Sequence, residues 1–164
     1  MIFLLFGEDK FQIHQKKEEI LRELSKKNKN FEVFSFDLEI EDWDKIQTHF
    51  KSSSFFSPLK IIVLQNPEKN KKFKESFLQE IEKYKASRNL ILIIIQEGKE
   101  KEFISLVKKY SRWWHFSYLQ ELELKRWIKD KFKKNSLQPD PEIVDFLVLK
   151  FGSNLWAIEN EIQK

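Results

Sequence analysis

The chain has 164 residues, of which 41% are hydrophobic and 15% aromatic, enough for one domain, or one domain and a fragment, with a bulky core. Its 30 basic and 26 acidic residues give a net charge of +4, which is only weak evidence for a polyanionic partner. The absence of cysteine excludes disulfides and thiolate metal sites, and three scattered histidines argue against any other metal site.

The first ten residues, MIFLLFGEDK, contain an apolar run from Ile2 to Phe6. No basic residue precedes this run, no small-residue cleavage site follows it, and it is too short to span a bilayer. It therefore predicts the first buried strand of a cytoplasmic protein rather than a signal peptide or a membrane anchor.

Further apolar runs without polar alternation predict buried strands, and segments of helical periodicity separate them. The expected strands are residues 2–6, 32–36, 60–65, 90–95 and 113–118, and the expected helices are 11–27, 42–50, 70–85 and one around 103–110. This alternation predicts a parallel sheet covered on both faces, which is a three-layer α/β domain ending near Tyr118. The run 90–95 is the most hydrophobic and is expected at the centre of the sheet.

The pattern changes after Tyr118, where three helices without strands are expected. The first is 122–135; Asp140 followed by Pro141 predicts the start of the second, and Gly152 its end. Ser153 is expected to cap the third helix, which runs to the last residue. The sequence thus predicts an α/β domain at 1–118 and a small helical domain at 119–164, and the ending within a helix suggests a longer protein.

The strand, glycine turn and helix at the N-terminus raise the question of a nucleotide-binding loop. Such a loop needs G-x-x-x-x-G-K-[ST], because its backbone N–H groups and its lysine hold phosphates. Here the turn has one glycine, Gly7, followed by Glu8 and Asp9, whose carboxylates would repel phosphate and suit the helix N-terminus themselves. No acidic residue ends the strand 60–65 to hold magnesium. The sequence therefore predicts the architecture of a nucleotide-binding domain without its chemistry and without a cofactor.

Four stretches are informative together: MIFLLFGEDKFQI, SSSFFSPLKIIVLQN, NLILIIIQEGKEKE and FGSNLWAIENEIQK. In order and spacing they resemble the N-terminal half of the delta subunit of bacterial DNA polymerase III, the clamp-loader subunit that opens the sliding clamp. They match, in turn, the family's opening strand and turn, its serine, Leu-Phe and strand motif, its central strand, and a helix beginning Gly-x-[ND]-Leu. Each motif is weak alone, and their succession along the whole chain makes the resemblance specific.

This resemblance implies an AAA+ fold, in which the sheet domain lacks a working phosphate loop and is followed by a small helical lid. It implies a non-catalytic subunit of the DNA polymerase III holoenzyme. The implied partners are the sliding clamp (the beta subunit), the gamma/tau and delta prime subunits of the loader and, indirectly, DNA; no membrane is involved. A helical collar domain follows in the family, and most contacts with the other loader subunits are expected there.

Phe55 and Phe56 stand side by side between serines and Pro58. The residues alone leave two interpretations open: aromatics that fill the core beside a strand, or an exposed pair on one helical turn capped by a serine. In the delta family a tip helix inserts a Leu-Phe pair into a hydrophobic pocket of the clamp. That pair aligns with Phe55 and Phe56, so the first position departs from the usual leucine. The resemblance implies a clamp-binding site made of Ser54, Phe55 and Phe56.

The stretch LKRWIKDKFKK, residues 124–134, carries six basic residues and one acidic residue. Lys125, Arg126 and Lys129 are candidates for contacts with DNA phosphates, and the alternative is a solvated helix face whose apolar side packs inward. Two other functions therefore stay open beside clamp binding: a degenerate nucleotide-binding enzyme and a DNA-binding module using helix 125–134. No arrangement of nucleophile, base and acid suggests a catalytic site.

Overall fold

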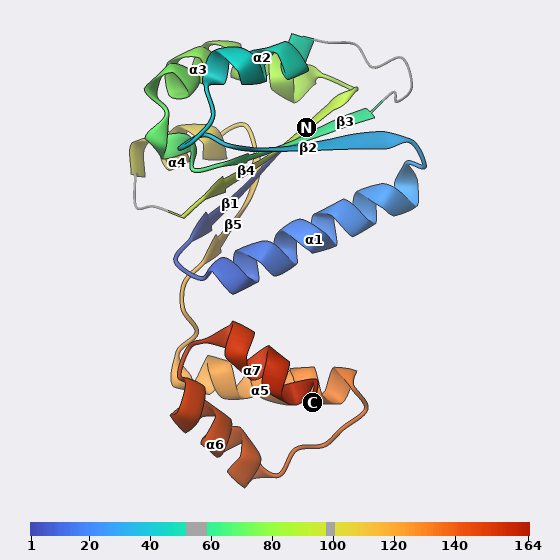
Figure 1. Ribbon diagram of the computed structural model, residues 1–164, viewed down its shortest axis with the longest axis vertical. Coiled ribbons are helices and arrows are strands. Elements are labelled where there is room, and N and C mark those ends of the chain that lie inside the picture. Colours follow the sequence, from blue (N-terminus) through green and yellow to red (C-terminus); the bar gives the residue numbers. More distant parts are fainter. Residues whose placement is uncertain (52–58, 98–100) are drawn as a thin grey trace. The chain divides into compact units, whose positions relative to one another are not determined.

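The computed structural model describes residues 1–51, 59–97 and 101–164 (Figure 1). The chain forms two compact units, Met1–Phe116 and Ser117–Lys164. The first unit contains β1 (Ile2–Gly7), α1 (Lys10–Lys27), β2 (Phe31–Asp37), α2 (Trp43–Lys51), β3 (Leu59–Gln65), the short 3-10 helix η1 (Pro67–Lys69), α3 (Lys71–Ala86), β4 (Leu90–Gln96), α4 (Lys101–Lys108) and β5 (Arg112–Phe116). The second contains α5 (Glu121–Lys134), α6 (Pro141–Phe151) and α7 (Leu155–Ile162).

The five strands of the first unit form one sheet in the order β2-β3-β4-β1-β5, and every neighbouring pair is parallel. In its register Leu4 of β1 lies between Ile94 of β4 and Trp113 of β5. The predicted α/β fold is thereby confirmed, and so is the central place of β4. Parallel strands need crossover connections, and the helices between successive strands supply them.

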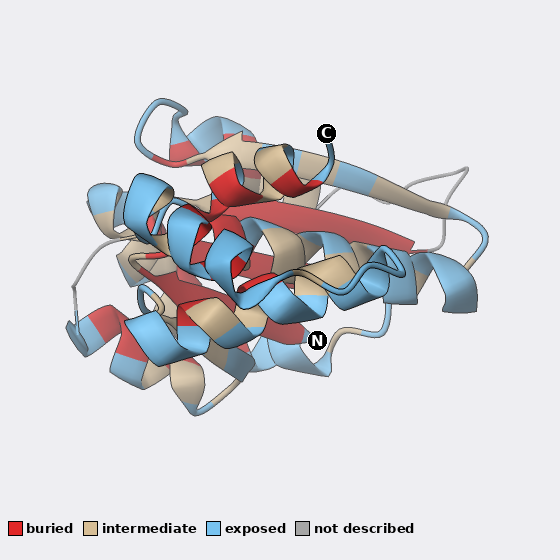
Figure 2. Cartoon of the chain, turned by 90° about the horizontal axis from the view of Figure 1, so that it is seen from below, coloured by how far each residue is buried: buried red, intermediate tan, exposed pale blue. Residues whose placement is uncertain are grey.

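Each face of the sheet has its own core, because successive side chains of a strand point to opposite faces. Ile2, Leu4 and Phe6 of β1 pack with buried residues of α2, α3 and α4, whereas Phe3 and Leu5 pack with Ile13 and Ile20 of α1. The inner strands β1, β3 and β4 are accordingly buried, the edge strands β2 and β5 are partly exposed, and the outward surfaces of the helices are exposed (Figure 2). The sheet is thus the middle of three layers, with α1 on one side and α2, α3 and α4 on the other (Figure 1).

Side-chain caps fix the starts of several helices, since the first N–H groups of a helix have no partner within it. The Asp9 carboxylate accepts from the N–H of Gln12 before α1, and the Asn70 side chain accepts from that of Phe73 before α3. The expected cap of α7 at Ser153 is wrong by one residue, because Asn154 accepts from Ala157.

The bounds of two elements and the presence of one short helix also differ from expectation. β5 begins at Arg112 and ends at Phe116 instead of reaching Tyr118, because its ladder is set by pairing with β1, which ends at Gly7. α7 ends at Ile162, before the last residue. The 3-10 helix η1 was not anticipated; it follows Asn66, which adopts a left-handed conformation with φ of 53°.

The second unit is a three-helix arrangement around its own small core. The buried residues of this core are Leu124, Ile128, Val144, Leu147, Leu155, Ile158 and Ile162. An ion pair of 2.8 Å between Lys131 and Glu159 links α5 to α7. Within the part of the chain that the structure describes, no helix is long and apolar enough to cross a membrane.

Candidate functional site

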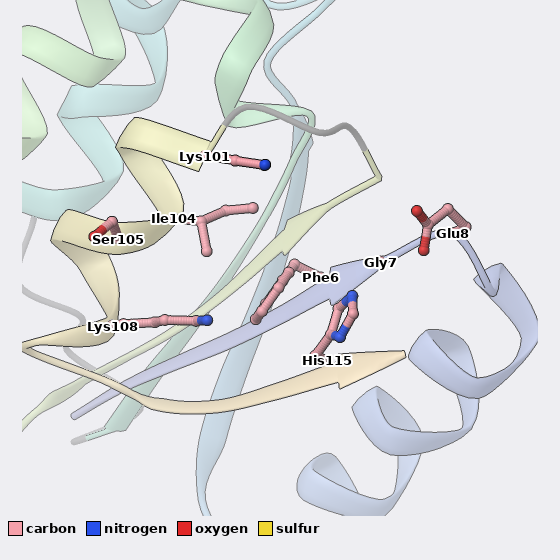
Figure 3. Close-up of a pocket in the computed structure, with 8 residues that line it drawn as sticks. All are labelled: Phe6, Gly7, Glu8, Lys101, Ile104, Ser105, Lys108 and His115. Carbon is pink, nitrogen blue, oxygen red and sulfur yellow. The ribbon is translucent and has the colours of Figure 1, made fainter. Parts of the chain in front are cut away.

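The carboxyl ends of parallel strands are where open α/β sheets bind their ligands. At this end of β1 and β5 lies a pocket of about 330 Å³, lined by residues of β1, α4 and β5 and by Glu8 (Figure 3). His115 stacks on the ring of Phe6 at a centroid distance of 4.8 Å. The Nζ atom of Lys108 lies 4.5 Å from the same ring centroid and 4.2 Å from that of Trp113. The side chains of His115 and Lys108 thus both lie against aromatic rings.

The turn after β1 is the place where a phosphate loop would bind its ligand. The backbone N–H groups of Glu8 and Asp9 both donate to the carbonyl oxygen of Phe116, at 3.0 and 3.1 Å. Gly7 permits this approach, because its φ is +138° and an added Cβ would lie 2.0 Å from that oxygen. The donors that would cradle a phosphate are thus occupied by the protein's own backbone.

Asp9 has the capping role that its position predicted. It is 2% exposed, and its two carboxylate oxygens accept from the backbone N–H and the side-chain amide of Gln12, each at 3.0 Å. A carboxylate at this end also interacts favourably with the helix dipole. The place of a phosphate at the N-terminus of α1 is therefore filled by a negatively charged side chain.

The pocket does not assemble a nucleophile with a base. Among the described residues no hydrogen bond links Ser105, His115 and Glu8 of this pocket. The described residues likewise contain no cluster of three side chains able to hold a metal ion.

The predicted clamp-binding residues Ser54, Phe55 and Phe56 fall in 52–58, outside the described residues, so their role stays a prediction. The structure does describe what lies on either side of that segment. α2 ends at Lys51 and β3 begins at Leu59, so the segment joins the sheet at the amino ends of its strands. This is the edge opposite the pocket after β1.

The residues on both sides of the segment contact other residues of the first unit. Before it, the Phe50 ring contacts Trp43 and Tyr84 at centroid distances of 5.3 and 5.1 Å. After it, Lys60 is buried, and its ammonium donates to the carbonyl oxygen of His49 at 2.6 Å. A buried ammonium needs such a partner, because its desolvation is costly. Lys60 therefore joins the start of β3 to the last turn of α2.

Sequence reasoning missed Lys60 as a contributor to this edge. The lysine interrupts the apolar run LKIIVLQ, which was the available signal that it has a specific partner. The partner itself lies on α2, and only the pairing of β3 in the sheet brings the two together.

The basic residues proposed for DNA contacts lie on α5 and differ in their exposure and in their ion pairs. Lys125 pairs with Glu121 and Asp145, each at 2.9 Å, and hydrogen bonds to these carboxylates raise the pKa of its ammonium. Arg126 and Lys129 are exposed and pair with no carboxylate of the described residues. The structure therefore leaves two of the three candidates available to an anion, and their role stays a prediction.

Together these features define a parallel α/β protein with the architecture of a nucleotide-binding domain, in which backbone contacts occupy the turn that would bind phosphate. The family model described as "DNA polymerase III, delta subunit" matches residues 3–118. The chain belongs to this family, as its motifs predicted. No curated protein sequence matches the chain significantly.

Solved structures show the same fold over nearly the whole chain. The Bacillus subtilis DNA clamp loader delta protein, YqeN, matches with a TM-score of 0.68 and 19% identity, covering 99% of this chain and 51% of that one. A mutant of Thermotoga maritima RuvB matches with a TM-score of 0.65 and 11% identity, covering 98% and 53%. At these identities the likeness establishes the fold alone. The chain spans about half the length of these proteins.

Proposed function

We propose that this chain acts as the clamp-binding part of a clamp-loader delta subunit. In this proposal Phe55 and Phe56 insert into a hydrophobic pocket of the sliding clamp, with Ser54 beside them. The observation that carries it is the family match over residues 3–118, which includes the segment holding both phenylalanines. The anchored residues on either side of 52–58 support it, because a rigid base reduces the entropy lost on binding.

The proposed action is mechanical. Docking near the clamp's ring interface favours a subunit shape that no longer closes the ring, so differential affinity for the open state shifts the population toward it. The chain makes and breaks no bond in this scheme. The backbone contacts of Glu8 and Asp9 with Phe116 support a non-catalytic role, because they use the donors that ATP would need.

The proposal also covers the organisation and the partners of the protein. We assign an AAA+-like sheet domain to residues 1–118 and a helical lid to 119–164, and the two compact units observed support this division. Gamma/tau and delta prime subunits of the loader are the further partners, reached mainly through the rest of a full-length delta subunit. A cytoplasmic location follows from a role in DNA replication.

The test is binding of the chain to the sliding clamp of its own species without nucleotide. A double variant, Phe55→Ala/Phe56→Ala, is compared with Phe146→Ala, which removes a half-exposed phenylalanine of the other unit. Far-UV circular dichroism checks that each variant is folded. Loss of two anchoring aromatics is expected to cost ~2 kcal/mol or more, about 30-fold in Kd, because hot-spot aromatics carry most of an interface's energy.

The outcomes separate clearly. Tight binding by the wild type and by Phe146→Ala, with loss in the double variant, supports the proposal. If the double variant binds as tightly as the wild type, the two phenylalanines do not form the binding site. If the folded wild type does not bind, clamp binding by this chain is overturned.

DNA binding by α5 is a second candidate. It is favoured by Arg126 and Lys129, which are exposed and form no ion pair with the described carboxylates. It predicts salt-dependent binding of duplex DNA that Arg126→Ala/Lys129→Ala weakens and Lys125→Ala changes less, because Lys125 is already paired. Equal effects of the two variants would contradict this assignment.

A further inference from the structure

A second pocket of about 330 Å³ opens at the amino ends of β1, β4 and β5, on the face of the sheet that α1 covers. All of its lining belongs to the first compact unit. Part of its wall is apolar: Phe3, Leu59 and Ile91 are buried, and Trp114 is half-buried. A cavity with such walls takes an apolar group more readily than a fully hydrated one.

Three exposed cationic side chains line the same pocket and come from different elements. Lys27 is the last residue of α1, Arg88 precedes β4, and Arg112 begins β5. None of them forms an ion pair with a carboxylate among the described residues. These three residues are called the basic rim below.

The other charged groups of the pocket do not cancel the basic rim. Lys16 is already engaged, since its ammonium pairs with Glu19 at 2.9 Å and lies 4.7 Å from the Trp114 ring centroid. Glu23 is the single carboxylate in the lining. The pocket therefore keeps a net positive charge, and an anion entering it meets cations that need not break an existing ion pair.

The basic rim lies on the edge of the sheet to which residues 52–58 connect. Leu59 lines the pocket and is the first described residue after that segment. The amino ends of β2, β3 and β4 and the end of α1 lie toward the upper right of the sheet in Figure 1. A partner that binds the segment between Lys51 and Leu59 would therefore meet the same edge of the sheet as the basic rim.

We propose that this pocket receives an acidic segment of the same protein partner, which is the sliding clamp if the proposed function holds. Carboxylates of that segment would pair with Lys27, Arg88 and Arg112, where arginine can bind a carboxylate through two N–H groups. An apolar side chain of the segment would contact the Phe3 and Trp114 walls. This inference rests on the proposed function and adds the chemistry of the partner's surface.

The apolar part of the wall favours a protein segment over the phosphate backbone of DNA. Phosphate contacts are made by cations reaching toward a hydrated, regularly spaced charge array, and they leave an apolar cavity unfilled. An acidic peptide segment that also carries an apolar residue fills both parts of the site. Exposed charges at the rim of such an interface mainly change the association rate and its salt dependence.

The experiment measures association rate and Kd for the species' own sliding clamp at several salt concentrations. The test variant is Arg88→Glu/Arg112→Glu, with Arg88→Gln/Arg112→Gln as the neutral version. The control is Lys45→Glu/Lys101→Glu, which makes the same change in net charge. Both control residues are exposed and lie in the first turns of α2 and α4, where glutamate is favourable.

At low salt we expect the charge reversal to slow association by about tenfold or more and the neutral version by less, because oppositely charged surfaces steer encounter. The control should change the rate by less than about threefold, and the salt dependence should flatten in the pocket variants only. Duplex DNA binding is measured in parallel, and we expect the pocket variants to leave it unchanged.

The results distinguish this inference from the proposed function. If the phenylalanine double variant loses binding while the pocket variants behave like the control, clamp binding stands and the acidic-segment inference is overturned. If the pocket variants lose DNA binding instead of clamp binding, the basic rim serves nucleic acid. A folded wild type that does not bind the clamp overturns both.

Discussion

The contact between the turn after β1 and the end of β5 predicts a specific cost for Gly7→Ala. An added Cβ would lie 2.0 Å from the carbonyl oxygen of Phe116, and real Cβ atoms essentially never approach closer than 3.0 Å. The two strand ends must therefore separate by about 1 Å, and neither partner is a flexible side chain that can turn aside.

The expected loss of stability has two parts. Separation by this distance lengthens the hydrogen bonds from Glu8 and Asp9 to Phe116, now 3.0 and 3.1 Å, beyond bonding range. Each is worth roughly 0.5–1.5 kcal/mol. Holding alanine at a φ of +138° adds backbone strain of about 1–3 kcal/mol. We therefore expect Gly7→Ala to destabilise the first unit by about 2–6 kcal/mol.

Gly152→Ala is the matched control, because Gly152 also has a positive φ of 52° but no atom within 4 Å of an added Cβ. Gly152→Ala should lower the unfolding free energy only by the backbone strain, about 1–3 kcal/mol. Urea unfolding gives the total loss for each variant. Residue-resolved hydrogen exchange reports on the two units separately, and the amides of Glu8 and Asp9 should lose protection in Gly7→Ala. Equal or smaller destabilisation by Gly7→Ala, with both amides still protected, would refute the argument.

Three further predictions concern the first unit. Asp9→Ala should lower the unfolding free energy by about 1–2 kcal/mol in urea denaturation, because it removes the cap of α1, while Asp9→Asn should retain most of it. ATP with magnesium should not raise the melting temperature, since the N–H groups of residues 8 and 9 are occupied; a clear upward shift would contradict the assignment. Burial and then the hydrogen bond to Glu80 raise the pKa of Tyr84, so the folded chain keeps a proton that the unfolded chain loses near pH 10. Stability should therefore fall as the pH rises above 10 in the wild type, less so in Tyr84→Phe, and identical pH profiles would count against this.

Local sequence patterns predicted most of the fold. The apolar runs and the helical periodicity between them identified every strand of the sheet to within two residues. In the inner strands β1, β3 and β4, burial on both faces leaves no regular polar alternation. Helix ends could be predicted at Asp9, Asp140 and Gly152, because helix capping depends only on residues close in sequence. The prediction of Ser153 as the cap of α7 was wrong, because the adjacent Asn154 has an equally suitable side chain and caps the helix.

The candidate site was predicted less completely. The missing Gly-Lys-Ser/Thr was visible in the sequence, and the four motifs indicated the family that the comparison then showed. The interpretation of Phe55 and Phe56 came from that resemblance, because two adjacent aromatics in a turn are compatible with either a core or an interface.

By itself, then, the sequence determined the succession of strands and helices, the α/β class and the absence of a phosphate-loop motif. Only the tertiary structure decided that the carbonyl oxygen of Phe116 occupies the turn after Gly7, that Lys60 joins β3 to α2, and that Lys27, Arg88 and Arg112 meet at one pocket. These contacts join residues far apart in the chain, so they depend on the strand order and register of the sheet. Local hydrophobic periodicity reports whether a strand is buried, and the order in which parallel strands pair is set by how all the crossovers pack together.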